Sequence, residues 1–129
     1  MYISEKIKII FEPEYEKLFP LTKIMWIENN YLDPLIYFYY NKKILSGIAI
    51  YEIFDNDYCH LWSFEIATNL RKQHLGTDFM NCLKSKFSTI YLFCTPGVEN
   101  FYKKCGFIAD NIENGYFYWD SSKFFINNI

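Results

Sequence analysis

The amino-acid sequence predicts an α/β fold of the α+β kind, built around a mixed, mainly antiparallel central sheet. Three observations lead to this prediction. Strand-like segments follow one another with short turns between residues 35 and 68, which is typical of an antiparallel meander. The apolar spacing then changes to that of a helix, and a short apolar run follows. The 129 residues, 51% of them apolar, suit one domain with a real core, and no repeat or linker divides residues 1–129.

The N-terminal part is expected to begin with a strand and to continue with two short helices. Residues 6–11 (KIKIIF) alternate polar and apolar side chains before running apolar, which suits a strand. A helix is predicted from about residue 14 to residue 19. Pro20 interrupts it, because proline lacks the N–H that a continuing helix needs, and residues 21–29 are expected to form a second helix.

Three consecutive strands form the predicted meander. Residues 35–40 and 44–54 are rich in β-branched and aromatic residues and flank a turn at residues 41–43. A second turn at residues 55–57 leads to a third strand over residues 58–68.

The pattern then changes to one helix followed by one strand. The helix is predicted because apolar side chains recur at helical spacing at Leu75, Phe79, Met80, Leu83 and Phe87. Residues 89–94 (TIYLFC) form a short apolar run, which indicates a strand buried on both faces.

The C-terminal part predicts a last helix and a closing hairpin. Pro96 and Gly97 open the helix, and Gly106 ends it as a left-handed cap. Residues 107–109 and 115–119 form the hairpin. The predicted order is therefore β-α-α-β-β-β-α-β-α-β-β.

Composition and charge argue against several functional classes. The net charge is −2 and no run of basic residues is longer than two, so a nucleic-acid partner is not expected. No uncharged stretch approaches the ~18 apolar residues that would cross a bilayer. Glu5, Lys6 and Lys8 stand where a signal peptide needs apolar residues, so we expect a cytoplasmic protein without a membrane partner.

The four cysteines, Cys59, Cys82, Cys94 and Cys105, indicate neither a metal site nor a disulfide framework. They form no CxxC motif, do not pair with the two histidines at metal-ligand spacing, and stand among apolar residues. We therefore expect free, buried thiols and no metal cofactor.

The segment that carries chemistry is residues 71–77 (RKQHLGT), between the meander and the helix that follows it. A strand-turn-helix junction directs several backbone N–H groups and the helix dipole toward one point, which suits a pyrophosphate. Gly76 allows a close approach of the backbone, and Arg71 adds a fixed positive charge. These residues by themselves leave open an ordinary turn with a solvated arginine.

Two segments resemble signatures of the GNAT superfamily, the acyl-CoA N-acyltransferases. Arg71-x-x-His74-x-Gly76 is similar to the family's (Gln/Arg)-x-x-Gly-x-(Gly/Ala) pyrophosphate loop, with His74 where the first glycine usually stands. Ile66, five residues before Arg71, matches the aliphatic residue that ends the preceding strand. Residues 100–107 (NFYKKCGF) are similar to the second signature, (Leu/Phe)-Tyr-x-x-x-Gly-Phe. One helix and one strand separate the two signatures, as that fold requires.

The resemblance covers about residues 35–119 and implies the family's fold, with helices on both faces of the sheet, and acetyl-CoA as co-substrate. The pantetheine arm is expected where the strand before the loop and the strand after the helix splay apart. His74 would either point away from the ligand or bring its imidazole near the phosphates. Thr95 stands where many relatives carry an asparagine that contacts the pantetheine. The residues expected to hold coenzyme A are Ile66, Ala67, Thr68, Arg71, Lys72, Gln73, His74, Leu75, Gly76, Thr77, Thr95 and Tyr102.

The resemblance also implies direct attack of an amine on the thioester, without a covalent enzyme intermediate. The Ile66 N–H would support the charge that develops on the thioester oxygen. Strand alternation places His60, Trp62, Phe64 and Ile66 on one face. His60 is the expected general base, because an unperturbed imidazole titrates near neutral pH.

Three further residues carry expectations about chemistry or charge. Glu52, on the neighbouring strand, is an alternative base or an amine-binding group. Glu65 lies on the face opposite His60 and is expected to be a surface or core-edge charge. Tyr102 occupies the tyrosine of the second signature, which implies that it donates a proton to the departing thiolate. Structural roles, a hydrogen-bonded histidine and a core tyrosine, remain the alternatives for His60 and Tyr102.

The sequence thus predicts an N-acetyltransferase that acts on a primary amine of a small molecule or a protein. Two alternatives stay open: a non-catalytic acyl-CoA-binding module, and an acetyltransferase that modifies proteins or aminoacyl-tRNA. The acidic chain with one arginine argues against tRNA, because phosphate contacts need clustered basic residues. Residues 123–129 (KFFINNI) would expose two phenylalanines unless they pack as a strand or at a subunit interface, so a homodimer is considered.

Overall fold

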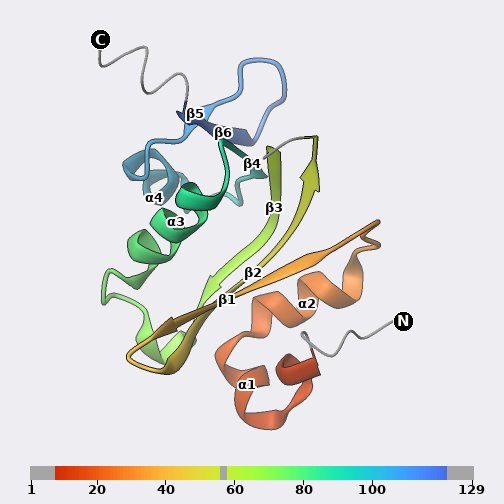
Figure 1. Cartoon of the computed structure of the whole chain (residues 1–129), viewed down its shortest axis with the longest axis vertical. Helices are drawn as coiled ribbons and strands as arrows, with labels where there is room; N and C mark the ends of the chain where they lie inside the picture. The colour runs from red at the N-terminus through yellow and green to blue at the C-terminus, as the bar shows by residue number, and fades with distance from the viewer. Residues whose placement is uncertain (1–7, 56–57, 122–129) are drawn as a thin grey trace. The chain divides into compact units, whose positions relative to one another are not determined.

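The computed structural model describes residues 8–55 and 58–121, which divide into two compact units. The first unit contains residues 8–52 and 62–79, and the second contains the remaining described residues. Figure 1 follows the chain from the N-terminus in red to the C-terminus in blue. The prediction of a single domain over residues 1–129 stays a prediction.

Strands and helices follow the predicted order after the first element. The strands are β1 (Leu35–Asn41), β2 (Ile44–Phe54), β3 (Tyr58–Ile66), β4 (Thr89–Phe93), β5 (Ile108–Ala109) and β6 (Tyr116–Asp120). The helices are η1 (Lys8–Phe11), α1 (Pro13–Leu18), α2 (Pro20–Glu28), η2 (Thr68–Leu70), α3 (Leu75–Lys86) and α4 (Glu99–Lys104), where η marks a 3₁₀ helix. The sheet order is β1-β2-β3-β4-β6-β5. The β3–β4 pair is parallel and the β1–β2, β4–β6 and β5–β6 pairs are antiparallel, which confirms the expected mixed, mainly antiparallel sheet.

In the first unit, β1 and β2 form the predicted hairpin. Asn41 pairs with Ile44, so Lys42 and Lys43 alone make the turn. Their φ angles of 52° and 66° are those of a type I′ turn, whose twist matches that of the two strands. The turn predicted at residues 41–43 is confirmed.

The core of the first unit joins the N-terminal helices to the hairpin. Figure 1 shows η1, α1 and α2 grouped together in red and orange. Burying each large apolar side chain contributes about 1.5–3 kcal/mol, so this cluster holds the helices in place. The buried members are Ile10, Phe19, Trp26, Leu45, Ile48, Ile50 and Ala67.

The predicted first strand is wrong over the residues that the structure describes. Residues 8–11 form η1, whereas residues 6 and 7 lie outside the described residues. Ile10 is fully buried, and its neighbours Ile9 and Phe11 pack against the same core. Three consecutive side chains cannot face one core from a strand, because strand side chains alternate between two faces. A tight helical turn allows all three side chains to pack against the same core.

β3 ends at Ile66, before the predicted residue 68. The Ala67 N–H still donates to the Ser46 carbonyl at 2.9 Å, but the chain then turns. The Leu70 N–H donates to the Ala67 carbonyl, also at 2.9 Å, and forms η2. This short 3₁₀ turn leads directly into residues 71–74.

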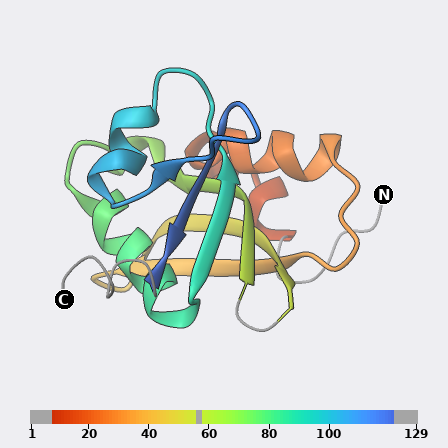
Figure 2. The same ribbon diagram turned by 90° about the horizontal axis from the view of Figure 1, so that it is seen from above.

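In the second unit, β4 pairs with residues 58–61 of β3 on one side and with β6 on the other (Figure 2). The expectation that this strand is buried on both faces is wrong. Ile90 and Leu92 are buried, whereas Phe93 is 58% exposed. The opposite face carries Tyr91, whose ring stacks on Tyr116 with centroids 4.9 Å apart. Stacking of aromatic side chains therefore replaces burial on that face.

The last helix starts later than predicted, and the closing hairpin is confirmed. α4 begins at Glu99, since Gly97 has a φ of 101°, which no helix accommodates. Gly106 has a φ of 90° and ends the helix as the expected left-handed cap. β5 and β6 pair in antiparallel register. The predicted turn at residues 55–57 lies partly, and the tail at 123–129 wholly, outside the described residues.

Candidate functional site

The two faces of β3 differ in burial, as the alternation predicted. The face with Cys59, Leu61, Ser63 and Glu65 is buried. The face with His60, Trp62, Phe64 and Ile66 is only partly buried. A one-residue shift of the strand would exchange the two sets, so the observed register places the predicted functional set on the accessible face.

His60 lies in the second unit between two aromatic rings. Its ring meets Tyr91 edge-on, with centroids 5.6 Å apart and an interplanar angle of 87°. It also meets Phe54 edge-on at 6.0 Å. These contacts fix the plane of the imidazole, while the residue as a whole stays partly exposed. His60 therefore has a defined orientation and access to solvent, as a proton acceptor needs.

Residues at the end of β3 form hydrogen bonds with other residues of the first unit. The Ala67 N–H is bonded to β2, and Ala67 is fully buried. The Thr68 hydroxyl donates to the Lys17 carbonyl at 3.1 Å, which ties η2 to α1. The Ile66 carbonyl accepts a hydrogen bond from Arg71 Nε at 3.2 Å. All three residues predicted here, Ile66, Ala67 and Thr68, thus have structural bonds that the sequence did not suggest.

Residues 71–74 form an exposed loop that runs into α3, whose first residue, Leu75, is buried. Leu75, Gly76 and Thr77 open α3, so their backbone N–H groups have no acceptor within the helix. The first N–H groups of a helix carry the positive end of its dipole. Lys72 adds an exposed positive charge. This row of available donors is what binds phosphate groups at helix N-termini.

His74 keeps the backbone conformation that glycine would give. Its φ is 61°, and Lys72 has a φ of 70°, so both residues adopt the left-handed region. L-residues enter this region at a cost of about 1–2 kcal/mol. His74 thus adopts a conformation that glycine would enter without this cost, and it adds an exposed imidazole to the loop.

Arg71 does not point freely into solvent. Its Nη2 donates to Glu65 Oε2 at 3.0 Å and its Nε donates to the Ile66 carbonyl. The Arg71 side chain is 52% exposed, whereas that of Glu65 is 2% exposed. The expectation of Glu65 as a surface or core-edge charge is wrong, because this carboxylate is buried and also accepts hydrogen bonds from α2.

Glu52 is buried in the first unit without a cationic partner among the described residues. Its Oε1 accepts from Trp62 Nε1 at 2.8 Å, and its Oε2 accepts from the Asp33 N–H at 2.6 Å. Tyr31 lies between two indoles, 5.8 Å from Trp26 and 5.7 Å from Trp62 by ring centroids. Burial, and then the charge of Glu52, raise the pKa of Tyr31 to about 12. Glu52 therefore places a negative charge beside an aromatic cluster.

Tyr102 lies on α4 in the second unit. Its ring meets Phe101 edge-on at 5.2 Å and Phe107 at 5.6 Å. Burial raises the pKa of Tyr102 above its ordinary range, and the neighbouring Cys94 and Cys105 add to this. Its hydroxyl has no hydrogen-bond partner among the described residues. The phenol is thus a protonated donor without an acceptor among the residues that the structure describes.

Thr95, the remaining predicted residue, is exposed in the turn after β4. Its carbonyl accepts from Cys94 Sγ at 3.4 Å and from the Val98 N–H at 3.4 Å. The backbone of Thr95 therefore shapes the approach to α4, and no bond of its hydroxyl to a described residue is seen.

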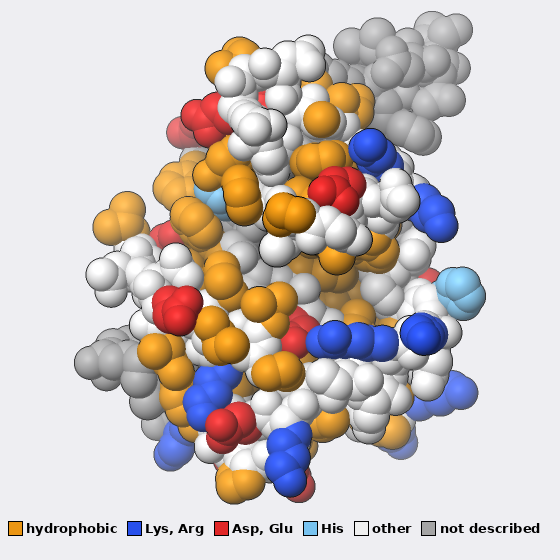
Figure 3. All heavy atoms as spheres, turned by 180° about the vertical axis from the view of Figure 1, so that it is seen from behind, with side chains coloured by type: hydrophobic (Ala, Val, Ile, Leu, Met, Phe, Trp, Pro, Cys, Tyr) orange, Lys and Arg blue, Asp and Glu red, His pale blue; other side chains and the backbone are white. Residues whose placement is uncertain are grey.

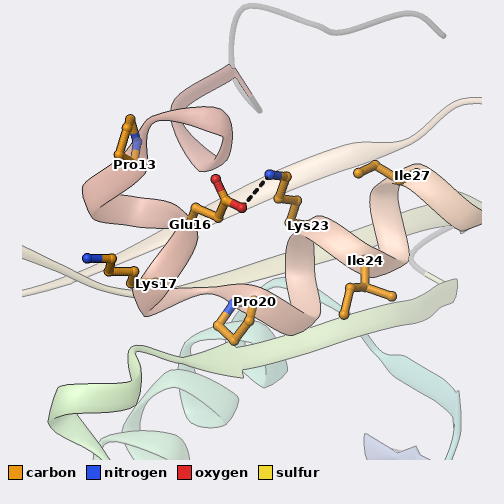
Figure 4. A pocket seen from close by; sticks show the side chains of 7 residues that line it. All are labelled: Pro13, Glu16, Lys17, Pro20, Lys23, Ile24 and Ile27. Carbon is orange, nitrogen blue, oxygen red and sulfur yellow. Dashed lines mark ion pairs between the residues drawn. The ribbon is translucent and has the colours of Figure 1, made fainter.

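A surface hollow of about 560 Å³ lies on α1 and α2, and none of the predicted site residues lines it. Figure 4 shows that the Glu16–Lys23 ion pair, of 2.7 Å, bridges the two helices beside it. In the lower part of Figure 3, basic and acidic side chains are interspersed with hydrophobic ones. The hollow is lined by Pro13, Glu16, Lys17, Pro20, Lys23, Ile24 and Ile27.

The described part of the chain offers no arrangement for a metal ion. No three His, Cys, Asp or Glu side chains of residues 8–55 and 58–121 are grouped so as to hold one. Cys59, Cys94 and Cys105 are free and buried, and Cys82 is free and half-buried. None of the described helices is both long and apolar enough to span a membrane.

Comparisons with known proteins match this chain to acetyltransferases. The model of the acetyltransferase (GNAT) family matches residues 2–107. An uncharacterized N-acetyltransferase, ycf52, of Gracilaria tenuistipitata var. liui is 32% identical over 98 residues, which are 70% of this chain. They are 54% of that relative, so the chain spans about half of its length.

Solved structures share the fold at low sequence identity. The ribosomal-protein-S18-alanine N-acetyltransferase of Escherichia coli is 13% identical, with a TM-score of 0.63 over 93% of this chain and 91% of that one. A Bacillus subtilis acetyltransferase, solved in complex with CoA, is 17% identical, with a TM-score of 0.55 over 93% and 94%. With the family model matching most of its length, the chain belongs to the acetyltransferase (GNAT) family.

Proposed function

We propose that this chain is an acyl-CoA-dependent N-acyltransferase, which transfers an acetyl group from acetyl-CoA to a primary amine by direct attack. The observation that carries the proposal is the segment of residues 71–77, in which an exposed loop leads into the first N–H groups of α3. Backbone donors at a helix N-terminus suit the pyrophosphate of coenzyme A. Membership of the GNAT family and the CoA complex of a structural neighbour support the same cofactor.

The loop would hold the pyrophosphate mainly through its backbone. Gln73, His74, Leu75, Gly76 and Thr77 would contribute N–H groups, and Lys72 an exposed ammonium. The guanidinium of Arg71 is directed toward Glu65, so we infer that its first role is to shape the loop. Acetyl-CoA supplies the activated thioester and a thiolate leaving group. The Ile66 N–H would face the carbonyl oxygen of the thioester.

His60 is the proposed general base. It would take a proton from the acceptor's ammonium and leave a neutral nitrogen for attack on the thioester carbon. The edge-on contacts with Tyr91 and Phe54 support this role, since they hold the plane of the imidazole. As the new C–N bond forms, the C–S bond breaks and the electron pair leaves on sulfur.

Glu52 is better suited to binding the amine than to accepting its proton. Both of its oxygens already accept a hydrogen bond, from Trp62 and from Asp33. A buried carboxylate without a cation is costly, and a protonated amine would provide the missing charge. The faces of neighbouring aromatic rings also attract cations. Glu52 would thus favour acceptors that arrive as ammonium ions.

Tyr102 is the proposed donor to the departing thiolate. Because burial raises the pKa of Tyr102, the phenol is protonated at neutral pH and can donate. Its hydroxyl has no other partner among the described residues, so donation to the sulfur breaks no existing bond. Thr95 would contribute to the pantetheine channel through its exposed position after β4.

The test is a thiol-release assay with acetyl-CoA and a panel of primary amines, together with calorimetric titration of coenzyme A. Amine-dependent thiol release and an acetylated amine in the mass spectrum would support the proposal. Binding tighter than about a millimolar without release for any acceptor would indicate the non-catalytic module, and no binding at millimolar ligand would refute the cofactor. Labelled acetyl-CoA with cell lysate distinguishes protein or aminoacyl-tRNA acceptors from metabolites. A cytoplasmic location and a homodimer stay predictions.

A further inference from the structure

We propose that Glu65 is a positioning residue for the coenzyme A loop: it fixes Arg71 and ties the loop to the N-terminus of α2. The proposal rests on the function proposed above, because it concerns the loop that would bind the pyrophosphate. The Glu65 carboxylate, with 3% of the residue exposed, faces α2 and Arg71, so any effect on the ligand would pass through these groups.

Glu65 provides the N-terminal cap that α2 otherwise lacks. The cap position is Phe19, which has no side-chain oxygen and makes no capping bond. Glu65 Oε2 instead accepts from the Leu21 N–H at 3.2 Å, and Oε1 accepts from the Thr22 N–H at 2.7 Å. The Thr22 hydroxyl also donates to Oε1, at 2.8 Å. A carboxylate at this point is stabilised by the positive end of the helix dipole.

The same carboxylate holds the first residue of the loop. Arg71 Nη2 donates to Oε2 at 3.0 Å, so one oxygen serves both α2 and the loop. A buried carboxylate with only neutral donors would carry an uncompensated charge, which is costly. Arg71 therefore turns inward to Glu65, although more than half of its side chain is exposed.

This contact closes a clamp over η2. Arg71 Nε donates to the carbonyl of Ile66, the last residue of β3, while Nη2 reaches Glu65 one residue earlier. The guanidinium thereby sets where the loop leaves the strand. Lys72 and His74, with φ angles of 70° and 61°, follow in a conformation that L-residues adopt only when their surroundings impose it. We infer that the clamp imposes it.

Glu65→Gln and Thr22→Val separate positioning from simple stability. Glu65→Gln removes the charge that attracts Arg71. Thr22→Val removes one hydrogen bond to the same carboxylate but leaves Arg71 and the loop untouched, so it is the matched control. Releasing the Arg71 side chain means that it must be ordered again on binding, which should raise the Kd for coenzyme A roughly three- to tenfold. Calorimetric titration with coenzyme A should therefore show that increase in Kd for Glu65→Gln and less than a twofold change for Thr22→Val.

Backbone NMR relaxation of the ligand-free protein provides the second measurement. Order parameters of residues 71–74 should fall from the rigid value of about 0.85 toward 0.6 in Glu65→Gln and stay unchanged in Thr22→Val. If Glu65→Gln does not fold, Glu65→Asp keeps the charge but withdraws it by one methylene, and the same results are expected.

The outcomes separate this proposal from the proposed function. If the unmodified protein binds no coenzyme A, the function fails, and the order parameters alone decide the role of Glu65. Equal order parameters in both variants, or equal Kd values where binding occurs, would overturn the positioning role. A raised Kd with an ordered, unchanged loop would also overturn it, since the effect would then not pass through the loop.

Discussion

Replacement of Tyr102 by phenylalanine tests the proposed proton donor with little expected effect on folding. The substitution removes one hydroxyl and keeps the ring between Phe101 and Phe107. The hydroxyl makes no hydrogen bond to a described residue, so none is lost on substitution. The free energy of unfolding should change by less than about 0.5 kcal/mol.

The expected loss of activity follows from the acidity of the phenol. An ordinary tyrosine has a pKa of about 10 and an alkyl thiol one of about 8.5, and burial raises the pKa of Tyr102 further. Complete proton transfer to the thiolate is therefore uphill by at least about 2 kcal/mol. A hydrogen bond to a charged sulfur, which contributes about 1.5–3 kcal/mol, is the available effect. Its removal should lower kcat roughly ten- to hundredfold.

Steady-state thiol release gives both kinetic constants. The KM for acetyl-CoA should stay within about twofold, because the interaction strengthens only as charge develops on sulfur. With its pKa raised, the phenol stays protonated up to about pH 10, so the ratio of the two kcat values should be constant from pH 6 to 9. Tyr40→Phe, at a 59% exposed position on β1, is the control. An unchanged kcat for Tyr102→Phe, or an equal loss for Tyr40→Phe, would refute the reasoning.

Three further predictions concern stability. Arg71→Ala should lower the free energy of unfolding by about 1–3 kcal/mol, because it leaves a buried carboxylate without its cation, whereas Lys72→Ala should cost less than about 0.5 kcal/mol. Equal melting temperatures would contradict this. Gly47→Ala should lower the free energy of unfolding, measured by urea denaturation, by about 1–3 kcal/mol, since its Cβ would lie 2.6 Å from Phe79 Cδ2. In a Phe79→Leu background the same substitution should lower it by less. A larger loss of stability from Gly47→Ala in the Phe79→Leu background than in the unmodified protein would exclude the clash. The raised pKa of Tyr31, about 12, means that stability present below pH 10 is lost as the pH rises toward 12, and Tyr31→Phe should lose less over that range. Absorbance titration with melting curves checks it, and parallel losses in both proteins would contradict it.

Periodic patterns made most of the fold predictable. The alternation along β3 correctly separated His60 from Glu65, because strand side chains point to opposite faces whatever the partner strand is. β2 was predicted at its observed bounds, since turn residues flank it on both sides. Boundaries moved where a local bond decided the outcome, as at Ala67, whose carbonyl accepts the N–H of Leu70 and starts η2.

The functional environment was less predictable, because it depends on contacts between residues far apart in the chain. Glu65 caps a helix 43 residues earlier, at Thr22, and no local spacing announces that bond. A single carboxylate on an otherwise uncharged strand face was the one available signal. Glu52 was identified as a candidate, but its bonds to Trp62 and Asp33, which favour binding over proton transfer, appear only in the structure.

His74 shows why the loop's path does not depend on glycine alone. A glycine at this position would adopt a positive φ without cost, whereas His74 does so at 61° and Lys72 at 70°. Something outside these residues must therefore compensate. The available compensation is the ion pair of Arg71 with Glu65, which fixes the residue immediately before Lys72. The chain's single arginine, at the start of the proposed pyrophosphate loop, thus connects that loop to a buried carboxylate.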